Sequence, residues 1–231
     1  MNTHTYYTAV GHFRRKTNAL DQSYPVIIIN QQEYCVDIQE MALWTALNWR
    51  LLDFSQIEAE YNKLDQDCII PARRTLEDCL GRLCTRGLVA SGTGETGFEA
   101  LYDLLGGLYV TPLSASLPLR LATFLKLTVL KGVSISKARE LFRRDRPNKQ
   151  EAQVMALSRQ ALLSTAELVK CAEVGAKDVS TDEKLMDALY NDNDTTSDNI
   201  PDMMLTAKNR ERITTAVANL YLRQQIIFQR V

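Results

Sequence analysis

The stretch PARRTLEDCLGRLCTRGLVASGTGETG, residues 71–97, restricts the fold of this chain more than any other part of the sequence. Leucines spaced three and four residues apart predict a helix over about residues 73–86 with one buried face. Gly87 stands where such a helix needs a C-terminal cap. Apolar residues and then three glycines within six residues follow, so we expect a short strand and a flexible tip.

Two further helices are expected before this stretch. Asp37 followed by Glu40 is a carboxylate version of the capping box, and it predicts the start of a helix that reaches about Leu51. A second helix is expected from Ser55 to Leu64. The β-branched run PVIIIN, followed by EYCV, predicts a short hairpin. Residues before this hairpin show little periodicity and are expected to form an irregular arm.

The second half of the chain has a helical pattern throughout. We expect a mainly α protein with one short hairpin, and no internal repeat is evident in the sequence. The expected organisation is an N-terminal arm over 1–24, a first domain over 25–113 and a helical domain over 114–231. The candidate helices of the helical domain span 117–130, 135–145, 151–173, 182–190 and 203–229.

Residues 37–97 resemble bacterial winged helix-turn-helix transcription regulators, and no narrower family is indicated. The resemblance rests on the order of three helices, on the segment TLEDCLGRLCTRGLV and on the glycine-rich tip. It implies a winged-helix domain that reads double-stranded DNA in the major groove with the helix that starts near Arg73. By position, the implied DNA-binding residues are Arg73, Arg74 and Thr75 at base edges, Arg82 at a phosphate and Thr93 on the wing tip.

Acidic side chains in the same region favour a different function. Glu77 and Asp78 lie one turn into the expected reading helix, and Glu95 lies in the glycine-rich tip. Residues 51–113 carry five basic and ten acidic side chains. Phosphates of the DNA backbone repel carboxylates that face them. The alternative is therefore a winged-helix module that assembles protein complexes without contacting DNA.

Residues 114–150, in contrast, carry nine basic and two acidic side chains, so a polyanion should be attracted to this segment first. One interpretation is a helix that contacts phosphates. The other is a solvated helix face that pairs with the acidic region of the same chain. Under the first interpretation, the further DNA-binding residues are Lys137, Arg139, Arg143 and Arg144.

The last expected helix, 203–229, carries an apolar stripe through Ile213, Val217, Leu220 and Ile227. Such a stripe either closes the core of its own domain or pairs with a second subunit. Regulators of the resembled kind are usually dimers on two-fold symmetric DNA sites, which implies a homodimer. The sequence does not indicate a small-molecule effector.

Catalytic and metal-binding patterns are missing from the sequence. The two histidines, His4 and His12, lie in the expected arm, and the five cysteines form an odd, unpatterned set. The glycine-rich GTGETG lacks the Lys-Ser/Thr ending of a P-loop. We therefore expect neither enzyme activity nor a cofactor nor a bound metal. The polar start of the chain and the lack of a long apolar run predict a cytoplasmic protein without a membrane partner.

Overall fold

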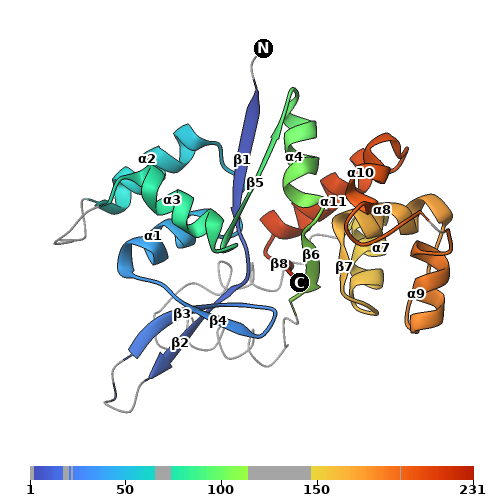
Figure 1. Ribbon diagram of the computed structural model, residues 1–231, viewed down its shortest axis with the longest axis horizontal. Coiled ribbons are helices and arrows are strands. Elements are labelled where there is room, and N and C mark those ends of the chain that lie inside the picture. The colour runs from blue at the N-terminus through green and yellow to red at the C-terminus, as the bar shows by residue number, and fades with distance from the viewer. Residues whose placement is uncertain (1–2, 18–20, 22, 66–73, 114–146, 193) are drawn as a thin grey trace, which may run out of the picture.

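The computed structural model describes residues 3–17, 21, 23–65, 74–113, 147–192 and 194–231 (Figure 1). Within these residues the fold is mixed α/β, with helices arranged around three small antiparallel sheets. The expectation of a mainly α fold is therefore wrong. Residues expected to form an irregular arm instead contribute two strands, and other strands are only two to four residues long, which is too short for a periodic sequence signal.

The strands of the described residues pair over long sequence distances. The first sheet joins β1 to β5, the second has the order β2–β3–β4, and the third places β6 between β7 and β8. The strand bounds are β1 His4–Ala9, β2 His12–Thr17, β3 Ser23–Ile29, β4 Gln32–Cys35, β5 Val89–Gly94, β6 Tyr109–Pro112, β7 Leu163–Ser164 and β8 Ile226–Gln229.

The helices are labelled as in Figure 1. Their bounds are α1 Ile38–Leu47, α2 Phe54–Asp65, α3 Leu76–Thr85, α4 Gly97–Leu105, α7 Lys149–Ser158, α8 Thr165–Val174, α9 Asp182–Leu189, α10 Ile200–Met203 and α11 Arg210–Leu222, with a 3-10 helix, η3, at Met204–Thr206. Among the described helices, none combines the length and the apolar character that a membrane crossing requires.

Local sequence signals account for several of these elements. Asp37 and Glu40 form the expected capping box at the start of α1. Gly87 follows α3 with a φ of 72°, the left-handed conformation that favours glycine. The expected hairpin forms from β3 and β4, and its turn residues Asn30 and Gln31 both have positive φ.

Other expected elements are divided differently in the structure. The helix expected over 151–173 is two helices, α7 and α8, because Leu163 pairs with β6 and Ser164 caps α8. The helix expected over 203–229 is divided into η3, α11 and β8. The helices expected over 117–130 and 135–145 lie outside the described residues.

Two parts of the chain share one topology, although no internal repeat is evident in the sequence. We call them the N-terminal unit (β1, α1, α2, α3 and β5) and the C-terminal unit (β6, α7, β7, α8, α11 and β8). In the N-terminal unit, Tyr7 of β1 pairs with Ser91 of β5 on one side and bridges to Leu52, just before α2, on the other. In the C-terminal unit, Val110 of β6 pairs in the same way with Phe228 of β8 and with Leu163, just before α8. In both units the strand that comes first in the sequence lies in the middle: β6 lies between β7 and β8, and β1 lies between β5 and the isolated bridge at Leu52. Its neighbours follow the first helix and the last helix.

The two units lie side by side, with β1 and β5 near the centre of the molecule (Figure 1). The buried Tyr221 of α11 joins them, because its hydroxyl accepts from the Trp49 N–H at 2.9 Å and donates to the Ala9 carbonyl at 3.2 Å. Helix α4 packs against both β5 and α11. Since the buried side chains of both units form one hydrophobic cluster, the relative placement of the units is fixed by packing.

Candidate nucleic-acid interface

Helix α3 is the element that the sequence singles out for DNA reading. Thr75 caps its start, since the Thr75 hydroxyl accepts from the Asp78 N–H at 3.2 Å. The inner face of the helix is held in the core by Leu76, Cys79, Leu80 and Leu83, which are all buried. The outer face carries the exposed residues Glu77, Asp78, Gly81, Arg82 and Thr85.

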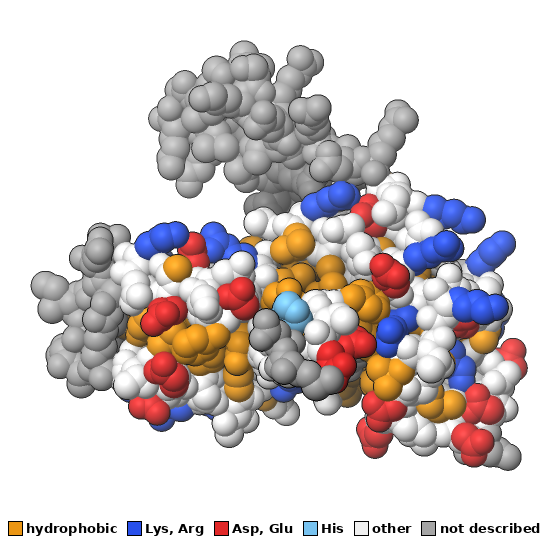
Figure 2. Space-filling model, turned by 90° about the horizontal axis from the view of Figure 1, so that it is seen from above, with side chains coloured by type: hydrophobic (Ala, Val, Ile, Leu, Met, Phe, Trp, Pro, Cys, Tyr) orange, Lys and Arg blue, Asp and Glu red, His pale blue; other side chains and the backbone are white. Residues whose placement is uncertain are grey.

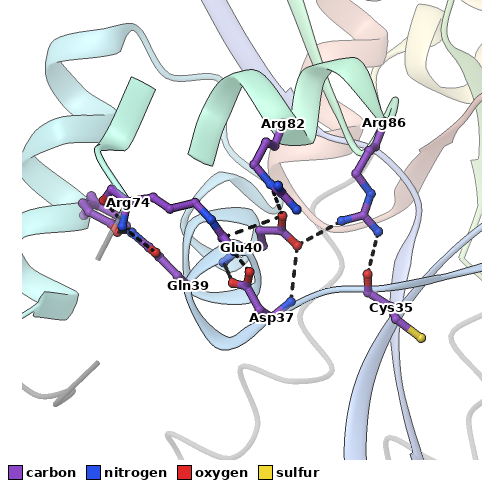
Figure 3. A network of polar contacts seen from close by, with 8 residues as sticks. Cys35, Asp37, Gln39, Glu40, Arg74, Arg82 and Arg86 are labelled. Carbon is purple, nitrogen blue, oxygen red and sulfur yellow. Dashed lines mark hydrogen bonds and ion pairs between the residues drawn. The ribbon is translucent and has the colours of Figure 1, made fainter. Parts of the chain in front are cut away.

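A cluster of ion pairs ties α3 to α1 (Figure 3). The carboxylate of Glu40, only 2% exposed, accepts from Arg82 Nε and from Arg86 Nη1, each at 2.9 Å. Arg74 Nη1 donates to Asp37 Oδ2 at 2.5 Å. Two carboxylates at the start of α1 thus hold three arginines that flank or belong to α3, and we call these five residues the α1–α3 clamp.

Opposing effects set the pKa of Asp37 in this clamp. Burial by itself raises the pKa of Asp37, but the Glu40 backbone N–H and the hydrogen bond and charge of Arg74 together lower it below the ordinary value. The pKa of Arg74 is raised, chiefly by its hydrogen bond to Asp37. Both residues are therefore held in their charged forms around neutral pH.

The clamp changes what the expected contact residues can do. Arg74, expected at a base edge, and Arg82, expected at a phosphate, both form ion pairs with carboxylates of the same chain. Arg82 still has 54% of its side chain exposed, and a guanidinium has five N–H donors. Its terminal amino groups can therefore reach an external anion while Nε stays bonded to Glu40.

Thr93 does not lie on a wing tip. It belongs to β5, where its hydroxyl shares a hydrogen bond of 3.2 Å with that of Thr5 on β1. Its backbone N–H donates to Asp103 of α4 at 2.7 Å. The chain after β5 enters α4, capped by Thr96, and the next strand, β6, belongs to another sheet, so no wing strand pairs with β5 among residues 95–113. The strand that pairs with β5 comes instead from the start of the chain.

The remaining expected contact residues are Arg73, Lys137, Arg139, Arg143 and Arg144, and all of them lie outside the described residues. The apolar stripe expected to close a core or a dimer is buried within the chain, at Ile213, Val217, Leu220 and Ile227. It therefore packs in the protein's own core, and a second subunit cannot use it without unfolding.

Sequence reasoning missed the role of Glu40 as the common acceptor of the clamp. The available signal was the spacing of Arg82 and Arg86, which lie four residues apart on one side of α3. The capping box already explains the position of Glu40 without reference to α3, because Glu40 Oε2 also accepts from the Asp37 N–H at 3.3 Å. One carboxylate therefore serves both the start of α1 and the attachment of α3.

Other sites offer less defined chemistry. A cavity of about 1100 Å³ lies between β2, α1 and the end of β6, and its apolar lining includes Phe13, Trp44 and Trp49. Among the described residues, no group of His, Cys, Asp and Glu side chains is arranged to hold a metal ion.

Comparison of the chain with protein-family models, with curated proteins and with solved structures finds no match.

Proposed function

We propose that this chain is a sequence-specific DNA-binding protein that reads the major groove with α3, acting as a bacterial transcription regulator in the cytoplasm. The observation that supports the proposal is the order α1, α2, α3 and β5, in which α3 is packed on its apolar face and exposed on its other face. In DNA-binding proteins built this way, the exposed face of the last helix enters the major groove.

The clamp fits this role as a device that orients α3. Reading helices must be held rigidly, because a base contact depends on side-chain placement to a fraction of an ångström. Arg74 and Arg86 fix the two ends of α3 on α1, and Arg82 lies between them on the outer face. In this proposal Arg82 contacts a phosphate, and Arg73, Lys137, Arg139, Arg143 and Arg144 supply further positive charge.

The experiment is a selection of bound fragments from random duplex DNA, followed by salt titration of the selected site. Arg82→Ala is compared with Arg86→Ala, because both variants remove one Glu40 partner but only Arg82 belongs to the outer face. We expect Arg82→Ala alone to lower the log–log salt slope by about 0.9, the value for one lost phosphate contact. Equal slopes for both variants would contradict the role given to Arg82.

The basic segment has its own test in the same assay. Replacing Arg143 and Arg144 by Ala should weaken binding on selected and scrambled duplexes alike, since phosphate contacts carry no sequence information. Replacing Arg73 should instead relax sequence preference, at about 1–3 kcal/mol per lost bidentate base contact. Wild-type affinity and slope in the double variant would assign these two arginines to a solvated or intramolecular face.

A second candidate function is a protein-assembly module that does not contact DNA. The observation that favours it is the outer face of α3, where Glu77 and Asp78 are exposed and Arg82 is already paired. The variant Glu77→Gln with Asp78→Asn separates the two functions. Under the DNA proposal it strengthens duplex binding by removing repulsion, whereas under the assembly proposal neither the wild type nor the variant binds duplex DNA.

A homodimer on a two-fold symmetric site completes the proposal. Because the stripe of α11 and β8 is buried within the chain, the dimer contact must use another surface. Analytical ultracentrifugation with and without the selected duplex measures this directly. A 1:1 complex on a site without two-fold symmetry would contradict the dimer while leaving DNA binding intact.

A further inference from the structure

We infer that the C-terminal unit is a second DNA-binding unit and that α11 is its reading helix, with Lys208, Arg212, Thr215 and Asn219 facing the duplex. This inference rests on the proposed function and extends it to a part of the chain in which the sequence indicated no interface apart from the dimer stripe.

Strand registers establish that α11 corresponds to α3. The pairs Tyr7–Leu52 and Tyr7–Ser91 in the N-terminal unit match Val110–Leu163 and Val110–Phe228 in the C-terminal unit. Counting back from the last strand of each unit, the helix that precedes it is α3 in one case and α11 in the other. Helix α11 packs on α7, as α3 packs on α1.

The ends of the two helices agree in backbone detail. Arg86 follows α3 and Arg223 follows α11, and the next residues, Gly87 and Gln224, have φ angles of 72° and 57°. The chain then turns back by the same hydrogen bond, from the Leu88 N–H to the Leu83 carbonyl and from the Gln225 N–H to the Leu220 carbonyl, each at 2.9 Å. A shared turn of this kind aims both helices in the same way relative to their strands.

Helices α3 and α11 pack on α1 and α7, and the starts of α1 and α7 also correspond. Asn148 and Glu151 form a capping box on α7, as Asp37 and Glu40 do on α1. Glu151, 1% exposed, accepts from Arg223 Nη1 at 3.1 Å. This ion pair is the counterpart of Glu40–Arg86, so α11 is fastened to α7 at the point where α3 is fastened to α1.

The outer faces of α3 and α11 differ in the charge of their side chains, which decides how each face interacts with DNA phosphates. On α3, the acidic Glu77 and Asp78 are exposed and Arg82 is paired with Glu40. At α11, Lys208 and Arg212 are exposed, and neither forms an ion pair within the described part of the chain. The exposed residues on this side are Lys208, Glu211, Arg212, Thr215 and the apolar Leu222, and the half-buried Asn219 lies between the last two.

These side chains suit a duplex. Arginine bonds both acceptors of guanine, asparagine bonds adenine in a bidentate manner, and lysine pairs with phosphate. Figure 2 shows that Lys and Arg side chains on the side of the C-terminal unit gather mainly toward one edge of the face in view, while acidic ones gather toward the opposite edge. Such a separation favours approach of a polyanion from the basic edge.

Arg210 has a different role at the start of α11. Its guanidinium lies 5.1 Å from the ring centre of Phe98 and 5.3 Å from that of Tyr102, both on α4. This double cation–π contact anchors the first turn of α11 on α4. Arg210 is therefore a positioning residue for the outer face of α11.

The test uses the full chain and the fragments that it selects from random duplex DNA. We compare the variant Lys208→Ala with Arg212→Ala against a control, Arg159→Ala with Lys177→Ala, which removes two exposed basic side chains elsewhere in the C-terminal unit. The α11 variant should bind the selected site about tenfold more weakly or worse, with a salt slope lower by about 0.9 for each lost contact. Asn219→Ala should change the selected sequence, and thermal melting checks that each variant is folded.

Three results are decisive. If the α11 variant loses affinity and one of two selected sequence elements while the control keeps both, the inference holds. If both variants bind like the wild type, the inference fails while the proposed function stands. If the wild-type chain binds no duplex DNA, the proposed function and the inference fail together.

Discussion

Arg223 Nη1 lies 3.1 Å from Glu151 Oε2, a buried carboxylate, and this ion pair fastens the end of α11 to the start of α7. Glu40 has the same place on α1 but is hydrogen-bonded to two arginines, Arg82 and Arg86, and has a third, Arg74, at 4.0 Å. Within the described residues, Glu151 Oε1 has no hydrogen-bond partner. The two units thus share an ion pair between a buried glutamate and an arginine. Both carboxylate oxygens of the glutamate have partners in the N-terminal unit, but only one has a partner in the C-terminal unit.

This difference between the two glutamates predicts that two matched substitutions lower the free energy of unfolding by different amounts. Arg223→Ala leaves the buried Glu151 without a cation, and we expect the free energy of unfolding to fall by about 3–5 kcal/mol. Arg86→Ala leaves Arg82 on Glu40, so we expect a loss of about 1–3 kcal/mol. Urea denaturation measures both, and an equal or reversed order would contradict the account given of the two pairs.

The correspondence of the units also predicts a stabilising substitution. Asn219 lies four residues before Arg223, as Arg82 lies four residues before Arg86. Asn219→Arg should therefore offer a donor to Glu151 Oε1 and raise the urea midpoint, by about 1 kcal/mol in unfolding free energy. The same substitution in the background Glu151→Gln should give a smaller gain, and an equal gain in both backgrounds would show that Glu151 is not the acceptor.

Gly92 and Gly81 offer a matched pair of glycine-to-alanine changes. A Cβ at Gly92 of β5 would lie 2.1 Å from the Leu104 backbone nitrogen, so Gly92→Ala must separate β5 from α4 and should cost at least about 3 kcal/mol. A Cβ at Gly81, within α3, meets nothing within 4 Å. Gly81→Ala should stabilise the helix by about 0.5–1 kcal/mol. Thermal melting of both variants checks the prediction, which fails if Gly92→Ala melts with the wild type.

Acid stability should depend on Asp37. Because its pKa in the folded protein lies below the ordinary 3.8, the unfolded chain takes up the proton more readily, so this contribution to stability is complete above about pH 4 and is lost as the pH falls further. Asp37→Asn keeps a side-chain cap, as Asn148 shows on α7, but removes the titrating group. We expect a flatter decline of unfolding free energy between about pH 5 and pH 2 in Asp37→Asn and in Arg74→Ala. Profiles parallel to the wild type would contradict this assignment.

The cysteines should differ strongly in reactivity. Burial, with a smaller effect of Glu40, raises the pKa of Cys79 to about 11, and burial raises that of Cys171 to about 12. Cys35 is exposed, so it should react with iodoacetamide in the native protein while the other two react only after unfolding in urea. Peptide mapping by mass spectrometry distinguishes the sites and keeps Cys68, outside the described residues, separate. Native labelling of Cys79 at the rate of Cys35 would refute the packing of α3 on α1.

The features that the sequence predicted correctly depend on residues that lie close together in the chain. The Asp37–Glu40 capping box and the turn at Gly87 depend on neighbours within four residues, and both form as expected. Strand β1 could not be found this way, because its partner β5 lies more than eighty residues further along the chain. Periodicity reports whether a segment has a buried face, and it does not report which distant strand covers that face.

The shared topology of the two units is not visible as a repeat in the sequence, and the reason is physical. What the units share is a cap, a buried glutamate, an arginine and a left-handed turn, and these tolerate different residues: Asp37 or Asn148 at the cap, Gly87 or Gln224 in the turn. Helices α9 and α10 also lie between α8 and α11, so the spacing of the signals differs in the C-terminal unit. The candidate site was located only in part, since Arg82 is exposed as expected while the acceptor of its ion pair lies on another helix.

The middle strand of each unit has a consequence for the order of folding. During synthesis β1 emerges long before β5, so it cannot pair until most of the N-terminal unit exists, and β6 in the same way emerges long before β8. The β1–β5 and β6–β8 pairings therefore join the two ends of long segments, an arrangement of high contact order that slows folding. A chain cut before residue 226 would have both α3 and α11 but no β8 to pair with β6.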